Sequence, residues 1–248
     1  MTNIALSGAM GKMGRVITNL VESRSDCTIT AKIDTHGDNV YTNISDITEP
    51  VDVVIDFSHP SALPNLLTYC KTKNIPLVAA TTGYNTDEVA QIKSAATQIP
   101  IFFTGNMSLG INLLQDLARR AVKILGDQFD VEIIEKHHNL KKDAPSGTAH
   151  MLADSINKEY SDSKKYVYDR HNVLKPRSKD EIGIHAIRGG TIVGEHEIIF
   201  AGHDEIISLS HSALSKEVFA VGAINAAIFM QNKPRGLYDM SDLLRSTI

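Results

Sequence analysis

The sequence predicts an α/β protein built from two different halves, and three observations support that fold class. Apolar strand-like segments alternate with helical segments as far as residue 103, as expected for an open parallel sheet. A glycine-rich loop separates the first strand from the first helix. Beyond residue 107, one long helix precedes several strands with tight turns between them, which is typical of an α+β arrangement.

The glycine loop follows a short apolar strand at residues 3–7. Gly8, Gly11 and Gly14 have the spacing G-x-x-G-x-x-G, with Met10 where the commoner fingerprint has a glycine. Gly8 would permit the tight turn, Gly11 would let a pyrophosphate approach the backbone, and Gly14 would let the helix pack on the strand. The alternative is a purely structural turn.

A second strand and an acidic residue complete this unit. Residues 28–33 are rich in β-branched side chains and are followed directly by Asp34. Asp34 lies about 20 residues after Gly14, the distance at which dinucleotide-binding folds place the acid that binds the ribose. The strand, loop, helix and acid together predict an N-terminal sheet of the Rossmann type that binds a dinucleotide.

The alternation then continues through the rest of the first half. In an open parallel sheet, ligands bind beyond the carboxyl ends of the strands, so the loops after these strands should line one crevice. The alternative for each single loop is a polar connection without a ligand. The predicted strands are residues 51–57, 75–80 and 100–103, the helices are residues 16–21, 58–73 and 87–96, and the loops begin at Ser7-Gly8, Phe57-Ser58, Ala80-Thr81 and Phe103-Thr104.

The second half predicts a small antiparallel or mixed sheet with helices on one face. Turns at Gly189-Gly190 and at residues 202–204 predict antiparallel neighbours among its last three strands. We interpret the polar stretch 161–180 as a segment that lies at the surface. The apolar helix 215–230 should return to the first domain. The predicted elements are helices 109–125 and 149–160 and strands 129–135, 182–188, 191–201 and 205–212. The domains that we expect are a dinucleotide-binding domain at 1–107, a substrate-binding and tetramerisation domain at 108–214 and a returning segment at 215–248.

A basic cluster at residues 135–149 is the most informative stretch of the chain. It places two histidines and three lysines just before Pro-Ser-Gly-Thr, in a protein of net charge -4. Ser146 is a candidate N-cap, so the amides of Gly147 and Thr148 should point out of a helix N-terminus. Such amides and the helix dipole would make an anion site there, with proton donors beside it. The alternative is a solvated basic loop before an ordinary helix.

Composition excludes several classes of protein. A net charge of -4 argues against a nucleic-acid-binding protein. Cys27 and Cys70 lie in apolar contexts and read as buried thiols of a reducing compartment. The chain starts directly with a strand rather than a signal peptide, and its most apolar run, 219–230, is shorter than the roughly 20 residues of a membrane span. We therefore expect a cytoplasmic protein, and no metal, since His137 and His138 are adjacent and poorly spaced for joint ligation.

Taken together, these residues resemble the 4-hydroxy-tetrahydrodipicolinate reductase (dihydrodipicolinate reductase) family of bacterial lysine biosynthesis. The resemblance spans essentially the whole chain. Its most specific element is E-x-H-H-x-x-K-x-D-A-P-S-G-T-A at residues 135–149, which looks like the family's signature. Supporting motifs are GAMGKMGR at 8–15, DFS at 56–58, TTG at 81–83, NMS at 106–108 and RGGTIVGEH at 188–196.

The resemblance implies a dinucleotide domain followed by a tetramerising substrate domain, in a cytoplasmic homotetramer. It implies that His137 and Lys141 match the family's catalytic pair, and that His138, Gly147 and Thr148 hold the substrate carboxylates. Asp34 would hold the adenosine ribose. The remaining cofactor contacts that it implies are Gly8, Ala9, Met10, Gly11, Lys12 and Met13 at the pyrophosphate, and Ala80, Thr81, Thr82, Thr104, Gly105, Asn106 and Met107 on the nicotinamide side.

One departure from the family pattern concerns the cofactor. Many members carry a basic residue directly after the ribose acid, where it can pair with the 2′-phosphate of NADP, whereas Thr35 and His36 follow Asp34 here. We therefore expect both NADH and NADPH to be used. Two other functions stay open: a different nicotinamide dehydrogenase of the same two-domain plan, which would not need the Lys/His cluster, and a non-enzymatic nucleotide-sensing module, which has no use for a proton donor.

Overall fold

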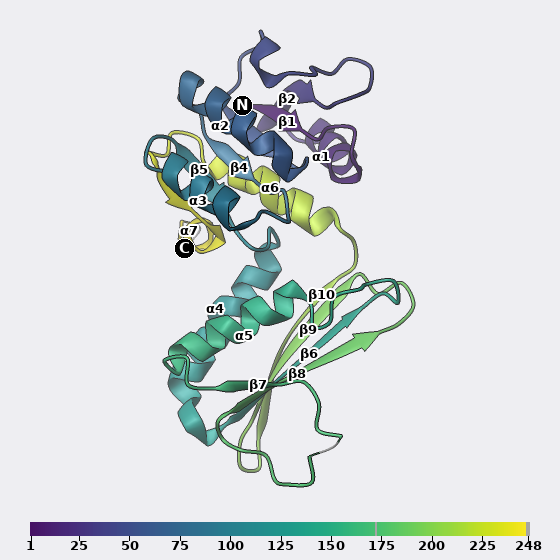
Figure 1. Ribbon diagram of the computed structural model, residues 1–248, viewed down its shortest axis with the longest axis vertical. Coiled ribbons are helices and arrows are strands. Elements are labelled where there is room, and N and C mark those ends of the chain that lie inside the picture. The colour runs from purple at the N-terminus through teal and green to yellow at the C-terminus, as the bar shows by residue number, and fades with distance from the viewer. Residues whose placement is uncertain (172, 247–248) are drawn as a thin grey trace. The chain divides into compact units, whose positions relative to one another are not determined.

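The computed structural model describes residues 1–171 and 173–246 and divides the chain into two compact units (Figure 1). The first unit combines Met1–Leu109 with the C-terminal segment from Glu217, and the second unit is Gly110–Lys216. The chain thus leaves the first unit once and comes back to it. No helix in the described ranges has the length and apolar character that a membrane crossing requires.

The first unit is a parallel six-stranded sheet in the order β11-β5-β4-β3-β1-β2. Adjacent residues of its strands point to opposite faces, so Ile4 and Leu6 of β1 enter one core while Ala5 enters the other. A Rossmann-type sheet with a core on each face is the result. Its elements are β1 (Thr2–Ser7), α1 (Lys12–Glu22), β2 (Cys27–Ile33), β3 (Val53–Asp56), α2 (Leu63–Lys73), β4 (Leu77–Ala79), α3 (Thr86–Ala95), β5 (Pro100–Phe103), α6 (Glu217–Phe229), β11 (Gly236–Tyr238) and α7 (Met240–Arg245), with 3-10 turns at Ile44–Asp46 and Pro60–Ala62.

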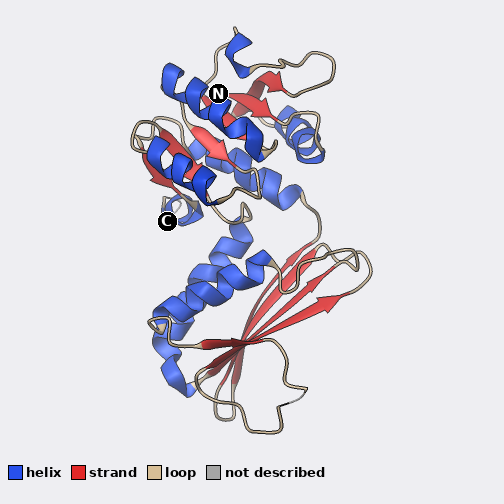
Figure 2. Ribbon diagram, viewed as in Figure 1, coloured by secondary structure: helices blue, strands red, loops and turns tan. Residues whose placement is uncertain are grey.

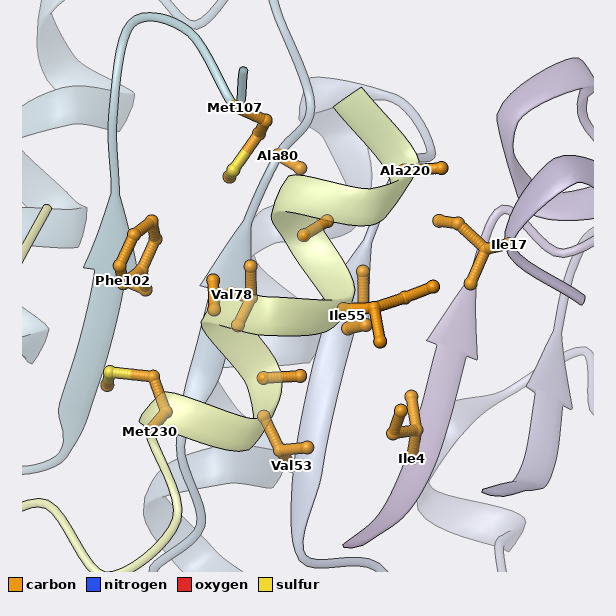
Figure 3. Packing of buried hydrophobic residues seen from close by; sticks show 14 of the residues in the cluster. Ile4, Ile17, Val53, Ile55, Val78, Ala80, Phe102, Met107, Ala220 and Met230 are labelled. Carbon is orange, nitrogen blue, oxygen red and sulfur yellow. The ribbon is translucent and has the colours of Figure 1, made fainter. Parts of the chain in front are cut away.

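Helix α6 returns to this sheet, as predicted, and shares one core with α1 (Figure 3). Its buried face consists largely of alanines, which let the helix backbone approach the strands closely. A Cβ on Gly222 would overlap the carbonyl oxygen of Met107, so only glycine fits at that position. The fully buried alanines of this helix are Ala220, Ala223, Ala226 and Ala227.

The C-terminal strand β11 pairs in parallel with β5, and the pattern analysis did not predict it. It has three residues, too few to show alternation, and its pairing partner lies more than a hundred residues earlier in the chain. Helix α7 follows it and begins with a capping box, in which Asp239 accepts hydrogen bonds from the amides of Ser241 and Asp242.

The second unit is a mixed five-stranded sheet in the order β10-β9-β6-β8-β7. Helices α4 and α5 lie on the same side of this sheet (Figure 2) and pack on it through one core that includes Leu114, Leu152, Ile133 and Phe200. The elements are α4 (Leu109–Leu125), a 3-10 turn at Gly126–Gln128, β6 (Asp130–His137), α5 (Gly147–Glu159), β7 (Lys165–Val167), β8 (Glu181–Arg188), β9 (Gly194–Ala201) and β10 (Ile206–Ala213).

The hairpin predicted at Gly189-Gly190 is wrong as a pairing of neighbours. Strands β8 and β9 do not pair with each other, because β6 lies between them, parallel to β8 and antiparallel to β9. The turn instead binds the end of β6: the amide of Gly189 donates to the carbonyl of His137 at 2.9 Å, and the amide of Asn139 donates to Gly190 at 3.2 Å. The β9–β10 hairpin is confirmed. A turn signal sets a reversal of direction, but it does not decide which strand fills the space between two antiparallel segments.

The polar stretch 161–180 is also not wholly irregular. Its residues Lys165–Val167 form β7, a short parallel edge strand beside β8. Three residues of mixed polarity give no periodicity that a sequence pattern could detect.

Candidate functional site

The glycine loop of the first unit is fastened to the ends of two strands. The amides of Gly8 and Ala9 both donate to the carbonyl of Ile33, at 2.9 and 3.2 Å. Gly8 has a φ of +78°, and a Cβ there would overlap the carbonyl oxygen of Phe57 and come within 2.9 Å of the Cα of Ser58. The loop therefore depends on glycine both for its backbone conformation and for its close approach to the end of β3.

Helix α1 begins directly behind this loop. Gly11 is its N-cap, and no side chain caps the first amides of the helix. A Cβ on Gly14 would overlap the backbone of Gly8 and Ala9, so the helix packs closely against the loop. An uncapped helix N-terminus beside a glycine loop fits the pyrophosphate of a dinucleotide, since its amides can donate to phosphate oxygens.

Asp34 lies at the end of β2 and braces the loop. Its carboxylate accepts hydrogen bonds from the amide of Met10 at 2.8 Å and from the amide of Thr35 at 2.7 Å. The imidazole of His36 is 82% exposed, and its Nδ1 lies 3.8 Å from the Asp34 carboxylate. A carboxylate has about four acceptor positions, so Asp34 keeps positions for ribose hydroxyls while it holds the loop.

Asp56 is a buried carboxylate at the end of β3 for which the pattern analysis assigned no role. It accepts hydrogen bonds from the hydroxyls of Ser58 at 2.5 Å, Thr81 at 2.7 Å and Tyr84 at 3.1 Å. Burial, followed by the charge of Asp56, raises the pKa of the Tyr84 phenol, which therefore stays a donor. One carboxylate thus ties the loop after β3 to the loop after β4. The sequence signal was an acid inside an otherwise apolar strand.

The predicted cofactor residues all lie at the carboxyl edge of this sheet or in the first turn of α1. Thr81 is buried in the Asp56 network, whereas Thr82 is exposed. The Met107 side chain is buried in the core that the sheet shares with α6 (Figure 3), and its carbonyl oxygen lies against Gly222. The structure groups the others in loops as follows: Gly8, Ala9, Met10 and Gly11 after β1, Lys12 and Met13 at the start of α1, Asp34 after β2, Ala80 after β4, and Thr104, Gly105 and Asn106 after β5.

In the second unit, Glu135 of β6 is fully buried and anchors the basic cluster. Its Oε1 accepts from Arg188 Nη2 at 2.7 Å and from the amide of Ser146 at 2.9 Å, and its Oε2 accepts from Arg188 Nη1 at 2.8 Å. Burial raises the pKa of Glu135, but the hydrogen bonds from Arg188 and then His137 outweigh burial and hold that pKa below its usual value. In the sequence, Glu135 and Arg188 are separate letters of two motifs, and nothing local shows that they meet.

His137 completes this cluster at the end of β6. Its Nδ1 lies 2.6 Å from Oε2 of Glu135, and its ring stands edge-on to that of His196, with centroids 5.3 Å apart. Burial, and then the neighbouring His137, lowers the pKa of His196 to about 4, so His196 is neutral at pH 7. Its Nε2 lies 3.2 Å from the hydroxyl of Ser146. His137 therefore has one neutral and one anionic neighbour.

Lys141 and His138 lie in the loop between β6 and α5. The ammonium of Lys141 pairs with Asp143 at 2.9 Å and has 22% of its side chain exposed. Arg188 Nη2 donates to the carbonyl of Asp143 at 2.7 Å, so the arginine held by Glu135 also holds this loop. His138 is half-buried, and its carbonyl accepts from the amide of Lys141 at 3.1 Å.

Helix α5 begins at Gly147, and Ser146 is its N-cap as predicted: the Ser146 hydroxyl accepts from the amide of Ala149 at 3.1 Å. Nothing lies within 4 Å of the position that a Cβ on Gly147 would take, so this end of the helix faces open space. Glu135 links His137 to the Ser146 amide at the start of α5, and Arg188 links the same carboxylate to the loop that carries Lys141. Among the residues described, no cluster of three or more His, Cys, Asp or Glu could hold a metal ion.

Comparison with known proteins agrees with this arrangement. The model for "Dihydrodipicolinate reductase, N-terminus" matches residues 2–107, and the model for "Dihydrodipicolinate reductase, C-terminus" matches residues 110–244. A 4-hydroxy-tetrahydrodipicolinate reductase of Caldanaerobacter subterraneus subsp. tengcongensis is 47% identical over 249 residues, covering 99% of each chain. One from Clostridium tetani is 47% identical over 251 residues, covering 99% of this chain and 98% of the relative.

Solved structures give the same relationship. A dipicolinate-bound dihydrodipicolinate reductase from Paenisporosarcina sp. TG-14 superimposes with a TM-score of 0.80 at 25% identity, covering 96% of this chain and 97% of that chain. A probable dehydrogenase from Thermotoga maritima, at 13% identity and a TM-score of 0.61, shares the fold alone. Because two family models together cover nearly every residue and the relatives align end to end, the chain belongs to the dihydrodipicolinate reductase family.

Proposed function

We propose that the chain reduces 4-hydroxy-tetrahydrodipicolinate to tetrahydrodipicolinate with NADH or NADPH, in the pathway to diaminopimelate and lysine. The observation that carries this proposal is that the start of α5, His137 and Lys141 belong to one hydrogen-bonded segment of the second unit, and we assign to them an anion site and two proton donors. An amino-acid dehydrogenase or a nucleotide sensor does not need this combination.

The first unit supplies the cofactor site. The uncapped amides at the start of α1 would hold the pyrophosphate, and Asp34 would accept bonds from the ribose hydroxyls. The Asp56 network keeps Thr81 at the carboxyl edge of the sheet, where it would face the nicotinamide. The reduced nicotinamide supplies the hydride, and the protein supplies position and charge.

The second unit supplies the substrate site. The substrate carries two carboxylates near a ring nitrogen. One carboxylate would accept bonds from the amides of Gly147 and Thr148, where the helix dipole of α5 favours negative charge. His138 would orient the substrate by a further hydrogen bond. Fixing the ring in this way places its reacting carbon for hydride transfer.

Proton delivery is the remaining task. Hydride transfer to one end of a conjugated C=C–C=N system builds negative charge on the far end, and a cationic donor there lowers the barrier. We assign Lys141 as the donor and His137 as a second donor or acid/base partner. To act, Lys141 would have to exchange its surface pairing with Asp143 for the substrate, a small cost since ion pairs at this exposure contribute about 0–1 kcal/mol.

The test of this function is the consumption of NADH and NADPH by the purified protein in the presence of freshly formed 4-hydroxy-tetrahydrodipicolinate. Matched reactions would replace that substrate by aspartate or by other amino acids with NAD. Turnover of the heterocycle alone supports the reductase. Turnover of an amino acid, or cofactor binding without turnover, would favour one of the two other functions.

Replacing Thr148 with valine should weaken substrate binding about tenfold to a hundredfold, since a hydrogen bond to a charged acceptor contributes about 1.5–3 kcal/mol. Valine has nearly the same shape as threonine but lacks the hydroxyl donor. Affinity for NADH, measured by fluorescence titration, should not change. An unaltered substrate KM would place the carboxylate site elsewhere in the chain.

Cofactor choice gives a second expected result. A 2′-phosphate beside Asp34 would meet a like charge, and the next residue, Thr35, carries no charge that could balance it. Lys12 and Arg15 would instead supply positive charge near the 2′-phosphate. We therefore expect kcat/KM values for NADH and NADPH within about tenfold of each other, a difference in transition-state binding of about 1.4 kcal/mol.

The Thr35→Arg variant should then shift the preference toward NADPH, because a guanidinium can bind a phosphate in a bidentate fork. The measurement is kcat/KM for both cofactors in the wild-type protein and in the variant. A wild-type protein that already prefers NADPH about a hundredfold would mean that another basic group binds the phosphate.

We also propose a cytoplasmic homotetramer assembled through the second unit. Several large apolar side chains of that unit are exposed in the single chain, among them Ile187 at 47%, Ile206 at 70% and Leu214 at 88%. Side chains of this kind, where they adjoin one another, would form a surface that becomes buried in an assembly. Sedimentation of the purified protein measures the mass of the particle directly.

A further inference from the structure

Glu135 is a buried acid whose side-chain oxygens accept hydrogen bonds from the groups around it. Its side chain is 0% exposed, and its two oxygens receive four hydrogen bonds in all, two from Arg188, one from His137 and one from the amide of Ser146. An arginine and a backbone amide can only donate. These donors hold the pKa of Glu135 below its usual value, so the group at the centre of this cluster is an ionised carboxylate at pH 7.

This carboxylate determines where His137 carries its proton. The Nδ1 atom of His137 faces Oε2 at 2.6 Å, and an ionised carboxylate can only accept, so Nδ1 must be the protonated nitrogen. In the neutral ring, Nε2 is then the nitrogen with a free lone pair. In the imidazolium, Nε2 carries the proton that can be transferred.

The other nitrogen of His137 is kept clear by the neighbouring strand. The residue beside it on β9 is Gly194, and a Cβ at that position would lie 3.1 Å from Nε2. Any side chain larger than a hydrogen would press on the ring there. His196, the other ring against His137, is neutral at pH 7 and adds no competing charge.

We infer that Glu135 is a positioning residue: its carboxylate, held by Arg188, fixes the tautomer and orientation of His137 so that Nε2 exchanges the proton with substrate. The same carboxylate binds the amide of Ser146, so the proton donor and the substrate-binding end of α5 share one anchor. This inference rests on the proposed function for the role of His137 in proton transfer. The effect on the tautomer does not depend on that function.

The decisive substitution is Glu135→Gln, which keeps the shape and removes the charge. The amide nitrogen of glutamine cannot sit at the Oε1 position, because it would face two groups that only donate, Arg188 Nη2 and the Ser146 amide. At the Oε2 position it would face one donor-only group, Arg188 Nη1, instead of two, and it could donate to His137 Nδ1 provided that the ring proton moves to Nε2. The substitution should therefore reverse the tautomer of neutral His137 and leave the charge of Arg188 unbalanced beside it.

Two measurements follow from this reversal. Long-range ¹H–¹⁵N spectra of histidine-labelled protein, recorded at alkaline pH where imidazoles are neutral, report which ring nitrogen carries the proton, and the His137 signals are identified by their loss in His137→Ala. We expect Nδ1–H in the wild-type protein and Nε2–H in Glu135→Gln. The kcat of this variant should fall about tenfold to a hundredfold, since the imidazolium loses its anionic partner, whereas the Kd for NADH should not change.

Glu132 provides a matched control on the same strand. It also accepts hydrogen bonds from a histidine and an arginine, His185 Nε2 at 2.8 Å and Arg177 Nε at 2.8 Å, but it is three residues away and belongs to a different cluster. Glu132→Gln should leave kcat within about twofold and should leave the His137 spectrum unchanged. A general loss of sheet stability would affect both variants alike, and thermal unfolding of both would reveal it.

The outcomes separate the two proposals. If Glu135→Gln leaves His137 with Nδ1–H, or if its kcat equals that of the wild-type protein while His137→Ala is impaired, the positioning role is overturned. If His137→Ala retains full turnover, the proposed catalytic role of His137 is wrong, even where the tautomer responds to Glu135. In the His137→Ala background, Glu135→Gln should cause little further loss of kcat, and an additive loss would show that Glu135 does not act through His137.

Discussion

Replacing Lys141 with alanine is expected to lower kcat by about two to four orders of magnitude, the usual contribution of a positioned acid. Lys141 is a half-buried cation in the loop that precedes α5, and Arg188, which donates to the carbonyl of Asp143, holds this loop independently of Lys141. Loss of its ammonium should therefore remove a proton donor without moving the anion site at the helix start.

The fold of this variant should remain intact. The Lys141–Asp143 pair is at the surface, with Asp143 59% exposed, so its loss changes the free energy of unfolding by about 0–1 kcal/mol. The hydrogen bond from Lys141 holds the pKa of Asp143 below its usual value, and the variant loses that effect as well. NADH affinity should be unaffected, because the residues that we expect to hold the cofactor belong to the first unit.

The matched control is Lys142→Ala, which removes the same charge from the next residue of the loop. Lys142 is exposed and has no role in the proposed site, so turnover should stay within about twofold. Steady-state kinetics with saturating cofactor measure both variants. A Lys141→Ala protein that turns over like the wild-type protein, with an unchanged unfolding temperature, would eliminate Lys141 as the donor.

Gly8→Ala is expected to have the largest effect on the first unit, with loss of cofactor binding and about 3–5 kcal/mol of stability. Two costs add. An L-residue at a φ of +78° is strained, and the new Cβ would overlap the carbonyl oxygen of Phe57. The loop would have to move away from β3, which would also break the bonds from Gly8 and Ala9 to Ile33.

The Gly126→Ala variant separates the cost of backbone strain at a positive φ from the cost of the steric overlap with β3. Gly126 also has a positive φ, +57°, but nothing lies within 4 Å of the position of its Cβ. This control should cost only the backbone term, about 1–2 kcal/mol, and should leave NADH binding intact. Thermal unfolding and NADH titration compare the two variants. Equal losses in both would show that the close approach of Gly8 to β3 is not important.

Several features of this protein were determined by the sequence itself. The glycine spacing followed by Asp34 predicted the β–loop–α–β unit, and the alternating apolar strands predicted a parallel sheet, because both are short-range signals of backbone conformation and burial. Ser146 capping α5 is equally local, since a cap and its amide are only three residues apart. The return of α6 followed from an apolar helix with no sheet of its own in the second half.

Other features were decided by the tertiary structure, because they depend on contacts between residues far apart in the chain. The position of β6 between β8 and β9 depends on which strand fills the sheet, and a turn signal does not contain that information. Asp56 and Glu135 illustrate the same point for the site. Asp56 meets Thr81 and Tyr84, and Glu135 meets Arg188 53 residues away, so the partners that make each buried acid tolerable come from other elements.

The same distinction applies to charge. Counting residues 135–149 gives an excess of cations, and the sequence therefore predicted a basic anion-binding cluster. In the folded chain, Arg188 enters this cluster from β8, but its two terminal nitrogens donate to Glu135 and to the carbonyl of Asp143, and Lys141 is paired with Asp143. The sequence determined which chemical groups are present. The fold decided which charges pair with one another, because a buried charge is stable only beside a partner that long-range packing brings to it.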